Sequence, residues 1–104
     1  MLHEFTPPQS CASMTELRQA IDALDARLVK LLALRQAYVE RAAVLKAERG
    51  AVHDAARIEE VVRKVVDEGK RAGLSPVIAE KVWRSLIDAS IAHEFAAFDA
   101  KPKA

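Results

Sequence analysis

Apolar residues recur at alternating steps of four and three along the first half of the chain. They occupy Leu17, Ile21, Leu24, Leu28, Leu31, Tyr38, Ala42 and Leu45, and Arg35 takes the remaining place in the series. This spacing puts all nine side chains on one face of an α-helix. We expect that helix to run from about Thr15, a plausible N-cap, to Arg49, with Gly50 as the stop. The charge of Arg35 then stands on a face that should be buried.

Two shorter helices should follow the first. Asp54 can cap a second helix, and Gly69 or Gly73 can end it. Its apolar face consists of Ile58, Val61, Val62, Val65 and Val66. Ser75 at the N-cap and Pro76 at the first helical position predict a third helix that runs to about Asp99. The pattern therefore predicts an all-α fold with three helices per chain.

These helices define the expected domain organisation. Residues 15–99 should form one helical domain, between a disordered N-terminal tail at 1–14 and a C-terminal tail at 100–104. The first helix, of roughly 35 residues, would span about 50 Å, so its apolar stripe is too long for the two shorter helices to cover. Four-three spacing over this length is typical of paired helices, and small oligomers are most often two-fold homodimers. We therefore expect a homodimer.

Composition and charge narrow the classes of function. Lys and Arg number 16, Asp and Glu 15, and the formal charge of +1 does not favour a nucleic-acid partner. No run of about eighteen apolar residues predicts a membrane span, and the first residues lack the features of a signal peptide. Cys11 is the only cysteine, which excludes an intramolecular disulfide and a cysteine-based metal cluster. We expect a cytoplasmic protein without a metal site.

Two cations on the first helix are candidates for binding an anion. Arg35 needs an anionic partner, which is either an internal Asp or Glu or a bound carboxylate that matches the guanidinium fork. Lys46 lies eleven positions later, so it shares the face of Arg35 at a spacing of roughly 16 Å. Considered alone, Lys46 would be a solvated surface lysine, but the two side chains could hold a small dianion between them.

A third cation cannot reach that ligand within one chain. Arg18 precedes Lys46 by 28 positions, or about 42 Å of helix. Considered alone, Arg18 is a surface residue of the first turn. In an antiparallel dimer it could instead reach the site centred on the partner's Arg35.

The other helices carry polar pairs. Asp54 and Arg57 are spaced i, i+3, which is also the pattern of a cap with a local ion pair. Ser90 and Glu94 are spaced i, i+4 on the third helix, where Glu94 could instead be an interfacial residue paired with arginine. With no Ser-His-Asp set and no Gly-rich loop, these residues indicate a site that binds and polarises a small polycarboxylate.

The run LRQAIDALDARLVKLLALRQAYVERAAVLKAERG resembles the opening helix of the all-helical chorismate mutases, whose pattern is LR…ID.LD..L..LL..R followed by a lysine. The resemblance covers roughly residues 15–98. The positions in register are Arg18, Asp25, Arg35, Lys46, Asp54, Arg57, Ser90 and Glu94. It implies an intertwined homodimer that rearranges chorismate to prephenate, a step of aromatic amino acid biosynthesis, with no cofactor.

The resemblance also implies a role for each matching residue. Arg35, Arg57 and the partner's Arg18 would bind the carboxylates, with help from Ser90. Lys46 and Glu94 would flank the ether oxygen as its bond breaks, which makes Arg35, Lys46 and Glu94 the expected catalytic residues. Asp54 would contact the ring hydroxyl.

Two departures from the family pattern leave the activity open. Many members have glutamine where this chain has Glu94, and a glutamate can donate only when protonated, so activity should fall as pH rises. Ile58 stands where the mutases often carry glutamate, and the segment from Lys46 to Arg57 is short. Both features resemble the related isochorismate pyruvate lyases, although Asp54 is mutase-like. The remaining alternative is a non-enzymatic helical dimerisation module, in which Arg35 forms a structural ion pair.

Overall fold

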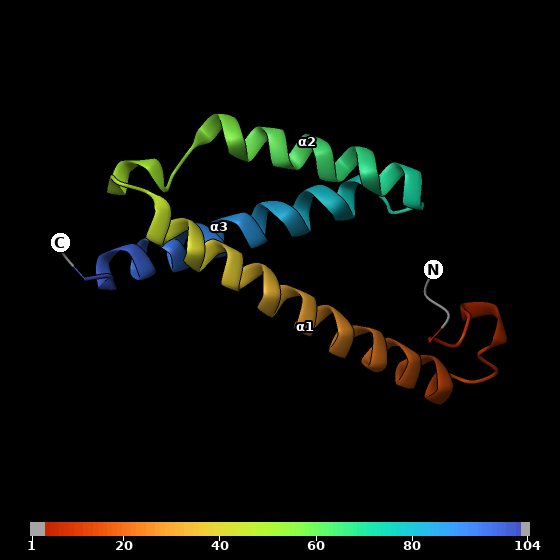
Figure 1. Ribbon diagram of the computed structural model, residues 1–104. Coiled ribbons are helices and arrows are strands. Elements are labelled where there is room, and N and C mark those ends of the chain that lie inside the picture. The colour runs from red at the N-terminus through yellow and green to blue at the C-terminus, as the bar shows by residue number, and fades with distance from the viewer. Residues whose placement is uncertain (1–3, 103–104) are drawn as a thin grey trace. The chain divides into compact units, whose positions relative to one another are not determined.

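The computed structural model of the protein describes residues 4–102. These residues form three α-helices and two short 3-10 helices, with no strand among them (Figure 1). The elements are η1 (Pro8–Ser10), α1 (Met14–Leu45), η2 (Arg49–Ala51), α2 (Ala55–Ala72) and α3 (Pro76–Ala100). The all-α class and the three helices are confirmed. The chain divides into two compact units, Met1–Ala37 and Tyr38–Ala104.

The start of α1 is set by a serine that precedes the expected cap. The Ser13 hydroxyl accepts a hydrogen bond from the Glu16 N–H at 3.2 Å, and the Glu16 carboxylate accepts one from the Ala12 N–H at 2.8 Å. This reciprocal arrangement resembles a capping box and satisfies backbone donors at the helix N-terminus. The expectation of Thr15 as N-cap was therefore wrong, because Ser13 takes that role and Thr15 lies within the helix.

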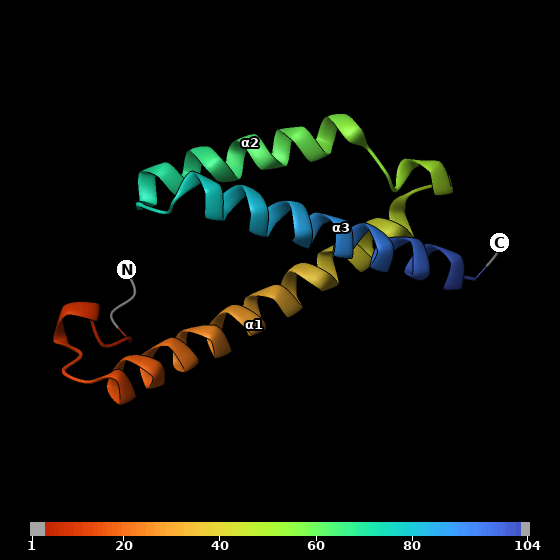
Figure 2. The ribbon, with the colours of Figure 1, turned by 180° about the vertical axis from the view of Figure 1, so that it is seen from behind.

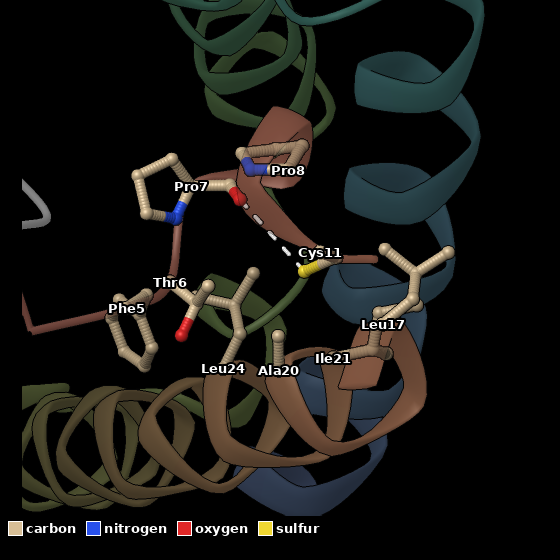
Figure 3. Close-up of a pocket in the computed structure, with 9 residues that line it drawn as sticks. All are labelled: Phe5, Thr6, Pro7, Pro8, Cys11, Leu17, Ala20, Ile21 and Leu24. Carbon is tan, nitrogen blue, oxygen red and sulfur yellow. Dashed lines mark hydrogen bonds between the residues drawn. The ribbon is translucent and has the colours of Figure 1, made fainter. Parts of the chain in front are cut away.

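The described part of the N-terminal segment, residues 4–13, includes η1. Figure 3 shows this segment beside the first turns of α1. The two line an apolar pocket of about 330 Å³. The lining residues are Phe5, Thr6, Pro7, Pro8, Cys11, Leu17, Ala20, Ile21 and Leu24. Residues 1–3 and 103–104 lie outside the described residues. Disorder of residues 1–14 and the assignment of residues 100–104 as a C-terminal tail stay predictions.

The end of α1 differs from the sequence expectation. The helix ends at Leu45 instead of Arg49, and the last helical hydrogen bond is donated by the Lys46 N–H to the Ala42 carbonyl at 3.0 Å. The chain then becomes extended at Glu48 and turns through η2, so Gly50 is not the C-cap. Val52, directly after η2, is buried.

Local chemistry explains the helical hairpin formed by α2 and α3, which lie side by side in Figures 1 and 2. Asp54 caps α2 by accepting from the Arg57 N–H at 3.0 Å. Gly73 ends α2 with a φ of 84°, a left-handed conformation that favours glycine. Ser75 caps α3, with Pro76 in its first turn. These predicted caps are confirmed, and α3 ends at Ala100, one residue beyond the expected end.

The buried apolar residues among those described all lie in the second unit, although large apolar side chains are exposed in both units. Within the second unit, the buried apolar residues are Ala43, Val52, Val62, Ala79 and Ile87. On α1, by contrast, Ile21, Leu28 and Leu31 are 48%, 47% and 49% exposed. A soluble helix seldom leaves a continuous apolar stripe in water, because each half-exposed side chain forgoes part of its burial energy. None of the helices described is long and apolar enough to cross a membrane.

Candidate active site

A partly buried ion pair between Lys46, directly after α1, and Glu94 of α3 forms the centre of the candidate site. The Lys46 Nζ lies 2.6 Å from the Glu94 Oε2, although 48 positions separate the two residues in the sequence. The Glu94 side chain is 9% exposed and the Lys46 side chain 30%. A buried carboxylate needs such a partner, since leaving it alone in an apolar setting is costly. The Glu94 carboxylate is therefore nearly enclosed, whereas solvent or a ligand can still reach the Lys46 ammonium.

The position of Lys46 in the backbone explains its reach. It is the first residue after α1, so its N–H completes the helix while its side chain starts where the chain leaves the helical path. Glu94 lies on α3 and is the one buried charged residue among those described. The Glu94 carboxylate accepts from the Lys46 ammonium, and an additional arginine partner for Glu94 stays a prediction.

A second ion pair holds the segment that follows Lys46. The Arg49 guanidinium donates to both carboxylate oxygens of Asp99, at 2.8 and 3.2 Å, and lies 4.4 Å from the centroid of the Phe95 ring. The hydrogen bond with Arg49 lowers the pKa of Asp99. Both side chains are more than half exposed, so this pair guides the chain path more than it stabilises the fold.

At the start of α2, the contact between Asp54 and Arg57 is a hydrogen bond between a side chain and the backbone. The Asp54 carboxylate accepts from the backbone N–H of Arg57. The Arg57 guanidinium instead pairs with Glu60, one turn further along α2. Ile58 is half-buried next to Arg57. A substrate carboxylate would therefore have to compete with Glu60 for the Arg57 guanidinium.

The remaining predicted residues have the following places. Ser90 is half-buried on α3, one turn before Glu94. Arg18 is exposed and Arg35 half-buried, and both belong to the part of α1 in the first unit. The convergence of Arg18 and Arg35 on the Lys46–Glu94 pair stays a prediction.

Sequence reasoning missed several contacts that surround the pair. His93, next to Glu94, contacts Glu40 of α1 at 2.6 Å between the ring Nε2 and the carboxylate. Lys101 donates to the carbonyl oxygens of Ala43 and Lys46. Each contact joins residues more than fifty positions apart, and no local spacing marks such partners. Among the described residues no cluster of His, Cys, Asp and Glu could hold a metal ion.

The arrangement can stabilise negative charge on a ligand without forming a covalent bond. Lys46 supplies an ammonium with three donors, and Glu94 supplies an acceptor that becomes a donor when it takes up a proton. A ligand oxygen in reach of both could accept from Lys46 at once and from Glu94 once that carboxyl is protonated. Such paired donors in a partly enclosed setting are suited to a reaction in which charge builds on one oxygen.

Comparisons with known proteins agree with this chemistry. The family model described as chorismate mutase type II matches residues 17–95, a stretch that includes most of α1 and α3 and all of α2. Among curated proteins, an isochorismate pyruvate lyase of Pseudomonas aeruginosa is similar to this chain. The two are 26% identical over 87 residues, which cover 84% of this chain and 86% of that protein.

Proposed function

This chain belongs to the chorismate mutase type II family, and from that premise we propose that it rearranges chorismate to prephenate. Family membership and the lyase relative indicate an enzyme and not a non-enzymatic dimerisation module. The observation that carries the proposal is the Lys46–Glu94 pair, a partly accessible ammonium held at 2.6 Å from a buried carboxyl. An ammonium beside a carboxyl is the arrangement expected for a reaction in which negative charge develops on an ether oxygen.

The proposed reaction is a 3,3-sigmatropic rearrangement in which the ether C–O bond breaks as a C–C bond forms within one molecule. It needs no cofactor and no covalent intermediate. Arg35, Arg57 and the partner's Arg18 would fix the two carboxylates, so that the substrate is held in its compact reactive conformer. Lys46 and Glu94 would stabilise the ether oxygen. Ser90 would assist at a carboxylate.

Asp54 has two tasks in this proposal, because one of its oxygens already accepts from the Arg57 N–H. A carboxylate has two oxygens, so its second oxygen can still accept from a ring hydroxyl. In this proposal Asp54 both caps α2 and contacts the substrate.

The second candidate activity is that of an isochorismate pyruvate lyase, which forms salicylate and pyruvate by a pericyclic elimination. Two observations favour it: the similarity to the Pseudomonas aeruginosa lyase, and the aliphatic Ile58 beside Arg57. Ile58 cannot accept a hydrogen bond from a ring hydroxyl, so the two substrates would be distinguished by shape and by Asp54.

Product identification tests the two activities directly. Purified protein is incubated separately with chorismate and with isochorismate, and the products are separated by chromatography. We expect efficient formation of prephenate from chorismate. Salicylate from isochorismate, with only feeble turnover of chorismate, would establish the lyase and make Ile58 a specificity determinant. Turnover of neither substrate would contradict both proposals.

We further propose that the working enzyme is a homodimer in which each site receives Arg18 from the other chain. The half-exposed apolar stripe of α1, with Ile21, Leu28 and Leu31, is the kind of surface that a second long helix covers. A closed two-fold pair would cover the stripe of both chains at once.

Mixing two inactive variants tests this sharing. Arg18→Ala and Lys46→Met should each be inactive alone, whereas a co-refolded equimolar mixture should recover about a quarter of the wild-type activity. Half of the dimers are then mixed, and each mixed dimer has one intact site. Each variant refolded by itself is the control. A mixture as inactive as its parents would show that Arg18 serves its own chain or none.

A further inference from the structure

The C-terminal end of α1 has no cation of its own. The last turn of the helix contains no basic residue, yet the final carbonyl groups of a helix carry partial negative charge and lack intrahelical donors. Lys101 supplies a positive charge and hydrogen-bond donors at this end of the helix. Its Nζ donates to the Ala43 carbonyl at 2.9 Å and to the Lys46 carbonyl at 2.7 Å.

The Lys101 side chain is itself held in place. Lys101 is the C-cap of α3, and its N–H donates to the Phe98 carbonyl at 3.3 Å. Its ammonium lies 3.9 Å from the centroid of the Phe98 ring, a cation–π distance. Two carbonyls and one ring thus fix a side chain that would otherwise move freely, and Lys101 is half-buried as a result.

These contacts give α3 two points of attachment to one residue. Glu94 contacts the side chain of Lys46, and Lys101 contacts its backbone carbonyl. Glu94 and Lys101 are seven positions apart, about two helical turns, so they lie near the same face of α3. The Lys46 carbonyl lies beyond the end of α1, and it accepts a hydrogen bond from Lys101.

We propose that Lys101 is a positioning residue for Lys46: by clamping the carbonyls at the end of α1, it fixes the backbone from which the Lys46 ammonium reaches the substrate. This inference rests on the proposed function of the Lys46–Glu94 pair. Lys101 lies beyond residues 17–95, the stretch that the family model matches, so the clamp is a feature of this chain and not of that match.

Lys101→Met tests the clamp, because methionine keeps much of the length and apolar character of the side chain and removes the ammonium. The matched control is Lys81→Met, an exposed lysine on the same helix. We expect kcat to fall about tenfold in Lys101→Met with KM within about twofold of wild type, since a misplaced donor weakens the transition state more than binding. Lys81→Met should match the wild type.

Hydrogen–deuterium exchange provides a readout that does not need activity. Residues 42–49 should exchange faster in Lys101→Met than in the wild type, while α2 is unchanged, because only the local attachment is lost. A kcat within twofold of wild type would overturn the proposal, as would unchanged exchange at 42–49. A lower melting temperature with normal kcat at 25 °C would make Lys101 merely structural and would also overturn it.

The two proposals fail in different ways. If the wild type converts neither chorismate nor isochorismate, the proposed function fails, and with it the catalytic meaning of the clamp. The attachment of Lys46 is then judged by exchange alone. If the wild type is active and Lys101→Met is equally active, only the role of Lys101 fails.

Discussion

Replacing Lys46 by methionine should lower kcat/KM for chorismate about a thousandfold, which is at the upper end of what one charge-stabilising donor contributes. The Lys46 ammonium donates to the Glu94 carboxylate at 2.6 Å, and its side chain is 30% exposed, so a ligand can reach it. The loss should appear mainly in kcat, because the donor matters most when charge has built on the ether oxygen.

The same substitution should also affect stability. Without Lys46 the buried Glu94 carboxylate loses this ion pair, so we expect the free energy of unfolding to fall by about 1–3 kcal/mol. Rates must therefore be compared well below the melting temperature of the variant, and circular dichroism must show that the helices are intact. A folded Lys46→Met that retained a tenth or more of wild-type kcat/KM would remove Lys46 from its proposed role.

The parts of the fold that sequence reasoning predicted correctly depend on neighbouring residues. Asp54, Gly73 and Ser75 act within three or four positions of themselves, so their cap roles follow from local chemistry. The N-terminal cap was placed two residues late because both Ser13 and Thr15 are suitable, and only Glu16 decides between them.

The incorrect predictions concern features that depend on contacts between residues far apart in the sequence. Helical propensity continues past Leu45, but burial of Val52 and the contact of Arg49 with Asp99, fifty positions away, favour a turn instead. The Lys101 clamp has the same origin. No periodicity links position 101 to position 46, so only the antiparallel return of α3 brings them together.

In the candidate site too, features set by sequence neighbours were predictable, and contacts between residues far apart in the sequence were not. Periodicity placed Arg35 and Lys46 on one face of a helix, and the family resemblance suggested that Lys46 and Glu94 work together. The contact between Lys46 and Glu94 appears only in three dimensions. The contact of Arg57 is local instead. Its guanidinium pairs with Glu60, three positions along the same helix, and we did not name Glu60 as its partner from the sequence.

Glu94→Gln should change the pH dependence of the reaction. A glutamate donates to the ether oxygen only when protonated, so wild-type kcat/KM should fall as the pH rises. Glutamine donates an N–H at every pH, and its carbonyl oxygen can still accept from Lys46. Its profile should therefore lack the fall with pH that the wild type shows.

The comparison is sharpest at high pH, where the variant should exceed the wild type by about ten- to a hundredfold. Glu68→Gln, an exposed carboxyl on α2, is the matched control and should keep the wild-type profile. A Glu94→Gln profile that still fell with pH would assign the titration to another group. A wild-type profile that is already flat would mean that Glu94 acts as a carboxylate, holding Lys46 in place while Lys46 alone donates to the ether oxygen.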